Sequence, residues 1–158
     1  MAEAAGRLIR IVLEGASLHR ISPAQEADRE QVVADLQAQN AFFPAARPGL
    51  HSVLHLSLQE GRLVFDIRDE RDEPVVAVML AMGPFKMLIR DYQMLLDSYA
   101  VAIAEGREAR IQAIDMGRRG LHNEGAQLLT ERLQGKVMID FQTARRLFTL
   151  VCALHQKL

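Results

Sequence analysis

Acidic, basic, imidazole and amide side chains gather in one stretch, residues 115–125, which also holds three glycines. Asp115, Arg118 and His122 are spaced three and four apart, so a continuous helix places them on one face. Arg118 or Arg119 is suited to bind an anion or a carboxylate in forked geometry, with His122 donating or relaying a proton and Asp115 holding an arginine in place. The alternative is a surface ion-pair lattice, in which an Asp115–Arg119 pair contributes about 0.2–0.5 kcal/mol.

The three glycines make this stretch a costly helix. Each interior glycine costs about 1 kcal/mol relative to alanine, so Gly117, Gly120 and Gly125 together weaken a continuous helix by roughly 3 kcal/mol. We expect that another backbone or a ligand comes close here, or that the helix breaks within the stretch.

A second basic pair, Arg145 and Arg146, lies in the last apolar segment. If that segment packs beside the 115–125 stretch, four arginines line one groove, which suits a phosphate, a nucleotide or an RNA backbone. The interpretation we favour instead pairs Arg145 and Arg146 with Asp140, Glu131 or an acidic turn. The candidate ligand-binding residues are Arg118, Arg119, His122, Asn123, Arg145 and Arg146, and an enzyme would use His122, Glu124 and Asp115.

Motifs for cofactors and metals are missing from the sequence. There is no glycine-rich dinucleotide or phosphate loop, and residues 117–120 match the G-x-x-G loop of RNA-binding KH domains only weakly. His51 and His55 share a strand face, but four strand residues span roughly 13 Å, which is too far for one metal ion. The single cysteine, Cys152, lies in an apolar run typical of a buried thiol. We therefore expect no metal and no cofactor.

Composition indicates one globular domain over residues 1–158, with residues 1–6 flexible. Apolar residues make up 49% of the chain and charged residues 25%, which excludes a disordered protein. The net charge of −1 gives no general basic surface for nucleic acid. One cysteine excludes an internal disulfide, and no apolar run resembles a signal peptide or a membrane span. We expect a cytoplasmic protein with no membrane contact.

The first half of the chain alternates between strands and one helix. We predict a strand at 7–14, a helix that starts at Ser22 and Pro23 and ends near residue 39, and an irregular segment at 40–50 in which Phe42 and Phe43 pack on the core. The runs 51–59, 62–68 and 75–82 read as an antiparallel meander, with turns at 60–61 and 69–74. Because 75–82 is nearly all apolar, we predict that it is central and covered on both faces. We expect the acidic turn, residues 69–74, to be a solvated loop.

The second half is mainly helical. We predict helices from Pro84 to about residue 104, from 107 to 133, and from 141 to about 156 behind an Asp140 cap, with a short strand at 136–139. The order β-α-β-β-β-α-α-β-α predicts an α+β fold: an antiparallel sheet of four to five strands, with helices mainly on one face.

Three stretches carry a resemblance to known proteins: residues 63–70, 113–125 and 140–150. On these strings the chain resembles a small uncharacterised bacterial protein family whose function is unknown. The resemblance implies a bacterial cytoplasmic protein, and it supplies no catalytic residues to transfer.

Three functions fit these observations, and they differ in what they require. The function we favour is a binding or regulatory protein whose arginines converge on a small anion. We expect it to form a homo-oligomer, and RNA is a weaker candidate ligand. The second is an assembly module whose glycine-notched helix docks on a protein partner, with the three glycines on one packed face. The third is a small hydrolase or transferase acting on a phosphate or carboxylate, which needs His122 in a cleft beside a carboxylate. We lean away from an enzyme.

Overall fold

The main sheet has four strands in the order β1-β3-β4-β5, in a computed structural model that describes residues 6–14 and 23–154. They are β1 (Leu8–Glu14), β3 (Ser52–Gln59), β4 (Arg62–Arg68) and β5 (Pro74–Ala81). β3, β4 and β5 form the predicted antiparallel meander, whereas β1 pairs parallel with β3. The sheet is therefore mixed and not wholly antiparallel. The reason is the helix between β1 and β3, because a helical crossover returns the chain in its original direction.

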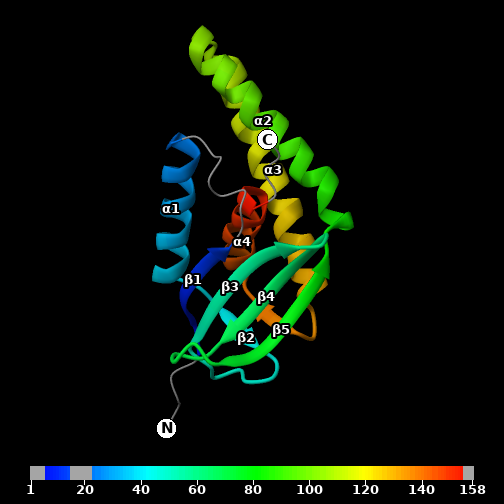
Figure 1. Cartoon of the computed structure of the whole chain (residues 1–158). Coiled ribbons are helices and arrows are strands. Elements are labelled where there is room, and N and C mark those ends of the chain that lie inside the picture. The colour runs from blue at the N-terminus through cyan, green and yellow to red at the C-terminus, as the bar shows by residue number, and fades with distance from the viewer. Residues whose placement is uncertain (1–5, 15–22, 155–158) are drawn as a thin grey trace.

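Four helices complete the predicted α+β class: α1 (Pro23–Ala38), α2 (Lys86–Glu105), α3 (Glu108–Leu133) and α4 (Phe141–Leu154). They lie to one side of the sheet, and the opposite face carries no helix from residues 6–14 or 23–154 (Figure 1). α4 is the central helix, since it packs on α1, α3 and β1. α2 and α3 form a long antiparallel hairpin whose tip projects away from the sheet (Figure 1).

Local signals set the ends of these elements as predicted. Gly106 and Gly135 adopt positive φ angles of 66° and 80°, one between α2 and α3 and one after α3. The Asp140 carboxylate accepts a hydrogen bond from the Thr143 backbone N–H at 2.8 Å, which caps α4. A short 3-10 helix, η2 (Gly83–Phe85), leads from β5 into α2. The expected cap at Ser22 and the expected flexibility of residues 1–5 fall outside the described residues.

The segment predicted to be irregular contains a short strand. β2 (Phe42–Pro44) pairs antiparallel with β6 (Val137–Ile139), and the two strands form a separate ribbon. Phe42 is fully buried in the core, as expected, whereas Phe43 is half-buried. Phe43 lines an apolar groove of about 570 Å³ between the ribbon and the end of α3. The strand was missed because it contains Pro44 and is only three residues long.

The prediction that residues 75–82 form a central strand covered on both faces is wrong. β5 pairs only with β4 and is an edge strand. Val78 and Leu80 point into the core, while Ala77, Met79 and Ala81 are exposed. The exposed positions are mostly alanine, whose hydropathy resembles that of a core residue although it has little surface to bury.

None of the helices in the described part of the chain is long and apolar enough to cross a bilayer.

Candidate functional site

The 115–125 stretch lies in the middle of α3, which is a continuous helix. Of the two alternatives, the break is absent, and the close approach comes from a side chain instead of a backbone or a ligand: a Cβ at Gly125 would overlap the buried ring of Phe148 on α4. A Cβ at Gly117 would lie 3.3 Å from a methyl group of Leu95 on α2, and one at Gly120 would meet nothing within 4 Å. Gly117 and Gly125 thus let α3 pack closely against α2 and α4, whereas Gly120 has no such role.

Arg118 points toward α2, where its guanidinium also interacts with the Tyr92 hydroxyl. Its guanidinium lies 3.8 Å from the Asp115 carboxylate, a long ion pair, and 5.5 Å from the centre of the Tyr99 ring. Its Nε atom is buried and has no hydrogen-bond acceptor among the described residues. The predicted Asp115 contact therefore forms with Arg118, while Arg119 is exposed.

His122 faces both α2 and α4. Its ring lies 5.1 Å from the Tyr92 ring, centre to centre, and its Nε2 lies 3.3 Å from the Thr149 hydroxyl oxygen. That hydroxyl donates its own proton to the Arg145 backbone carbonyl at 3.1 Å. Because the Thr149 hydroxyl already donates its proton, its oxygen accepts one from His122. This assigns a neutral ring with its proton on Nε2, which leaves Nδ1 as an acceptor.

Burial is the largest cause of a low His122 pKa, followed by the charges of Arg145 and Arg118, and together they lower it to about 4. The ring is therefore neutral near pH 7. The charges of Arg118 on α3 and Arg145 on α4 both act on His122, so one arginine from each of two helices lies near its ring.

Arg145 completes this cluster from α4. One guanidinium nitrogen reaches the Gln142 side chain at 3.3 Å, and Nε is buried without an acceptor. Within residues 6–14 and 23–154, three buried side-chain polar atoms lack a partner, and two of them are the Nε atoms of Arg118 and Arg145. A buried donor without a partner costs about 1–3 kcal/mol, and more when it is charged. We call Arg118, His122, Arg145 and Thr149 the arginine cluster.

Four of the predicted site residues, Arg119, Asn123, Glu124 and Arg146, do not join the arginine cluster. The side chains of Arg119, Asn123 and Glu124 are exposed. Arg146 turns the other way and donates to the backbone carbonyl of Gln39 at 3.2 Å, just beyond the end of α1. A cation is favoured at a helix C-terminus, so the position of Arg146 indicates a structural role. The favoured pairing of these arginines with Asp140 or Glu131 does not occur among the described residues.

The arrangement offers little to an acid–base catalyst. The two carboxylates considered as partners of His122 lie elsewhere, Glu124 at the surface and Asp115 beside Arg118. A base with a pKa near 4 is weak at neutral pH. Cys152 is buried on α4, and burial raises the pKa of its thiol, which disfavours a reactive thiolate. No group of three or more metal-ligating side chains occurs in the part of the chain that the structure describes.

A second polar cluster lies at the helix-free face of the sheet. The His55 ring nitrogens lie 2.6 Å from a Glu14 oxygen and 2.8 Å from an Asp72 oxygen, and Arg68 pairs with Asp66 and Asp72. The hydrogen bond from His55, and next that from Arg68, hold the pKa of the Asp72 carboxyl below its usual range. The acidic turn is therefore ordered in part and not simply solvated. All its charged groups are engaged with one another, so this cluster is structural.

Tyr92, Tyr99 and Thr149 contact the candidate site but were not predicted as site residues. The two tyrosines are seven residues apart on the apolar stripe of α2, where they read as core residues. Tyr92 is buried, and its burial raises the pKa of the phenol. The sequence did carry one signal for the tyrosines. Phenylalanine would pack equally well at these positions, so the choice of tyrosine indicates that its hydroxyl has a partner. Thr149, four residues after Arg145, gave no signal of its own.

Comparison with known proteins gives a consistent family match. The profile of an uncharacterised protein family, UPF0262, matches residues 5–157. A UPF0262 protein of Acidiphilium cryptum is 64% identical over 99% of this chain and 96% of its own. A UPF0262 protein of Granulibacter bethesdensis is 58% identical over 98% of this chain and 93% of its own, and one of Maricaulis maris is 45% identical over 99% and 98%. No solved structure matches the chain.

Proposed function

The chain belongs to the uncharacterised protein family UPF0262, and we propose that it binds a small oxyanion between Arg118 and Arg145. The single observation that carries the proposal is the pair of buried Nε donors, one on α3 and one on α4, that lack an acceptor. Guanidinium groups match the geometry of phosphate and carboxylate oxygens, and hydrogen bonds between charged groups are about twice as strong as neutral ones. An anion at this position would supply the missing acceptors.

The neighbours of the two arginines also favour a bound anion. The only carboxylate paired with either arginine in the described residues is Asp115, at 3.8 Å, so the positive charge is poorly balanced. The cation–π contact with Tyr99 orients Arg118 without neutralising it. His122 is neutral, so it adds no third charge and its Nε2–H is directed to Thr149. This combination suits binding more than catalysis, in keeping with a binding or regulatory protein of the bacterial cytoplasm.

The two alternative functions have less support. In the assembly module, the three glycines would share one face that docks on another chain. Gly125 and Gly117 instead lie against Phe148 and Leu95 of the same chain. The hydrolase or transferase would need a carboxylate beside His122, whose contacts are Thr149 and Tyr92.

The test is thermal unfolding in phosphate, sulfate, small carboxylates and nucleotides, with chloride at matched ionic strength as the reference. An anion at a hundred times its Kd stabilises the fold by about 2.7 kcal/mol, or about 5–10 °C in a protein of this size. Arg118→Lys and Arg145→Lys keep the charge and remove the Nε donor, so each is expected to lose most of the shift. Arg119→Lys is the matched control, because its guanidinium is exposed one residue away. The proposal fails if no anion exceeds chloride, or if Arg119→Lys loses the shift equally.

Proton uptake gives a second, independent readout. A bound anion offsets the arginine charges that, after burial, lower the pKa of His122. The pKa of His122 is therefore higher in the complex, and binding takes up protons as the pH falls toward the free value of about 4. Sulfate keeps a constant charge over this range, so its affinity is expected to rise as the pH falls toward 4 in the wild type and to change less in His122→Asn. Equal pH dependence in the two proteins would count against the site.

A further inference from the structure

The outward face of α2 carries three large apolar side chains that nothing in the described structure covers. Met87, Met94 and Val101 are 65%, 60% and 54% exposed, and each is seven residues from the next. Residues seven apart drift by only about 20° around a helix, so the three form one stripe. The opposite face of α2, with Ile89 and Tyr92, is buried in the protein. α2 is therefore apolar on two faces, which is the pattern of a helix packed between two neighbours.

We propose that this stripe docks on the same stripe of a second copy of the chain, with the two α2 helices antiparallel about a two-fold axis at Met94. In this register Met94 meets the partner's Met94, and Met87 lies opposite the partner's Val101. Heptad spacing of apolar residues is the arrangement by which two helices pack side by side. The inference is independent of the proposed anion site, because the arginine cluster contacts α2 through Tyr92 and Tyr99 instead.

Charge complementarity identifies the second copy as the occupant. At about 100° per residue, Arg90 and Asp97 lie about 40° and 60° to the same side of Met94. A two-fold axis perpendicular to the helices brings equal flanks together. Arg90 therefore faces the partner's Asp97, and Asp97 faces the partner's Arg90. Asp91 and Ser98 lie on the other flank and face each other, so the register creates no like-charge pair.

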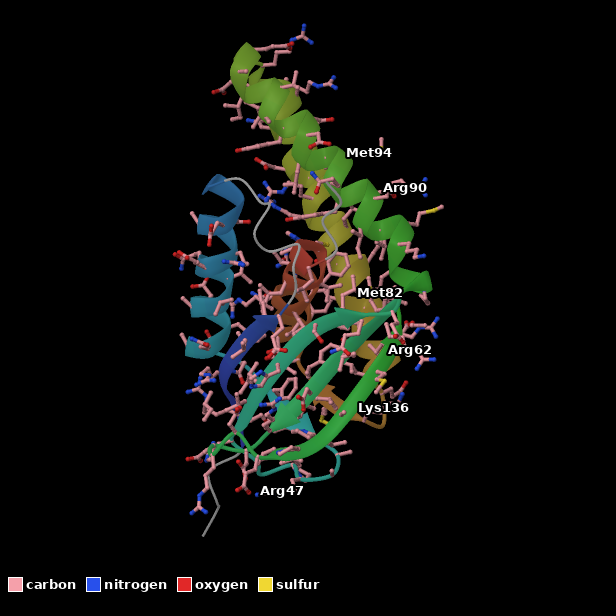
Figure 2. The ribbon with its side chains drawn as sticks, in the orientation of Figure 1. Arg47, Arg62, Met82, Arg90, Met94 and Lys136 are labelled. Atoms are coloured by element: carbon pink, nitrogen blue, oxygen red, sulfur yellow. The ribbon has the colours of Figure 1, made fainter. Side chains whose placement is uncertain are left out.

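The surroundings of these residues agree with an open, self-complementary surface. Arg90 makes no ion pair within the described residues, and Asp97 accepts one hydrogen bond, from Gln93 at 3.1 Å. Figure 2 shows Met94 and Arg90 on α2 at the margin of the molecule. The α2–α3 hairpin extends well beyond the sheet, which leaves room for a second hairpin beside it (Figure 1). A surface that matches itself about one residue is the property of a two-fold dimer interface.

The first experiment measures mass in solution by light scattering and sedimentation equilibrium. The wild type is expected to show twice the 17.7 kDa of one chain. Met94→Asp places two carboxylates on the two-fold axis and is expected to show the mass of one chain, with an unchanged circular dichroism spectrum. Met116→Asp is the matched control, since Met116 is 70% exposed on α3, and it is expected to stay dimeric. A wild type with the mass of one chain at every concentration, or equal loss in both variants, would overturn the proposal.

Charge reversal tests the antiparallel register itself. Arg90→Asp and Asp97→Arg each turn both cross-pairs into like-charge pairs, so each is expected to raise the dimer Kd about tenfold or more. The double variant restores both pairs and is expected to recover the wild-type Kd. An equimolar mixture of the two single variants is expected to form a mixed dimer. If the double variant dissociates like the single ones and the mixture does not associate, the register is wrong.

Discussion

Two glycines five residues apart on α3 provide a sharp test of how the helix packs. A Cβ at Gly120 would meet nothing within 4 Å, whereas a Cβ at Gly125 would overlap the ring of Phe148, which is fully buried. The substitutions Gly120→Ala and Gly125→Ala are chemically identical and lie in the same helix. Any difference between them therefore reports tertiary packing and not helix propensity.

The expected magnitudes follow from two opposing effects. Alanine is favoured over glycine in a helix interior by about 1 kcal/mol, and this gain applies at both sites. At Gly125 the added methyl group also forces Phe148 to move within a close-packed core, and such overpacking costs about 1–3 kcal/mol or more. We expect Gly120→Ala to raise the free energy of unfolding by about 0.5–1 kcal/mol and Gly125→Ala to lower it by about 1–2 kcal/mol.

Urea unfolding at pH 7, followed by circular dichroism, measures both variants against the wild type. The difference between them is expected to be about 1.5–3 kcal/mol, well above the uncertainty of comparing midpoints at equal m-values. A double variant that adds Phe148→Leu to Gly125→Ala is expected to recover part of the loss relative to Phe148→Leu alone, because the smaller side chain relieves the overlap. If Gly125→Ala is as stable as Gly120→Ala, Phe148 does not pack on Gly125 and the α3–α4 interface described above is wrong.

Two further predictions concern stability. His122 has a pKa of about 4 in the folded protein, from burial first and two arginine charges second, against 6.5 when unperturbed. The unfolded chain therefore binds the proton first, so stability present above about pH 6.5 is lost as the pH falls toward 4, by about 1–2 kcal/mol after allowing for solvent screening of a half-buried ring. Urea unfolding of His122→Asn should lack this decline; an unchanged pH profile would contradict the assignment. Asn40 donates to backbone carbonyls of β1 and α1 and accepts from a β1 N–H, at 2.7–2.8 Å. Asn40→Ala should lower the free energy of unfolding by about 2 kcal/mol, against less than about 0.5 kcal/mol for exposed Asn123→Ala.

The elements that local chemistry determines were predicted closely. Each helix end described here that was predicted from a local signal falls within about two residues of its predicted position, because Gly106, Gly135 and Asp140 act on their immediate neighbours. The hairpin at 60–61 has the same origin, since Glu60 and Gly61 both take the positive φ angles that a tight turn needs.

Only part of the candidate site could be predicted from the sequence. The spacing of Arg118 and His122 placed them on one side of α3, which a helical period alone decides. Arg145 and Arg146 were equivalent in the sequence, and the packing of α4 separated them: Arg145 joins the arginine cluster, and Arg146 binds the end of α1. Tyr92, Tyr99 and Thr149 entered the site only through the approach of other helices.

What the sequence by itself determined is the α+β class, the alternation of apolar faces, and the places where helices and turns begin and end, since each depends on residues within one or two turns of one another. Only the tertiary structure decided the parallel pairing of β1 with β3, the edge position of β5, and which arginine meets His122. These features depend on contacts between residues far apart in the chain. The type of a residue indicates which interactions its side chain can make, whereas the fold decides which other residue is close enough to make them.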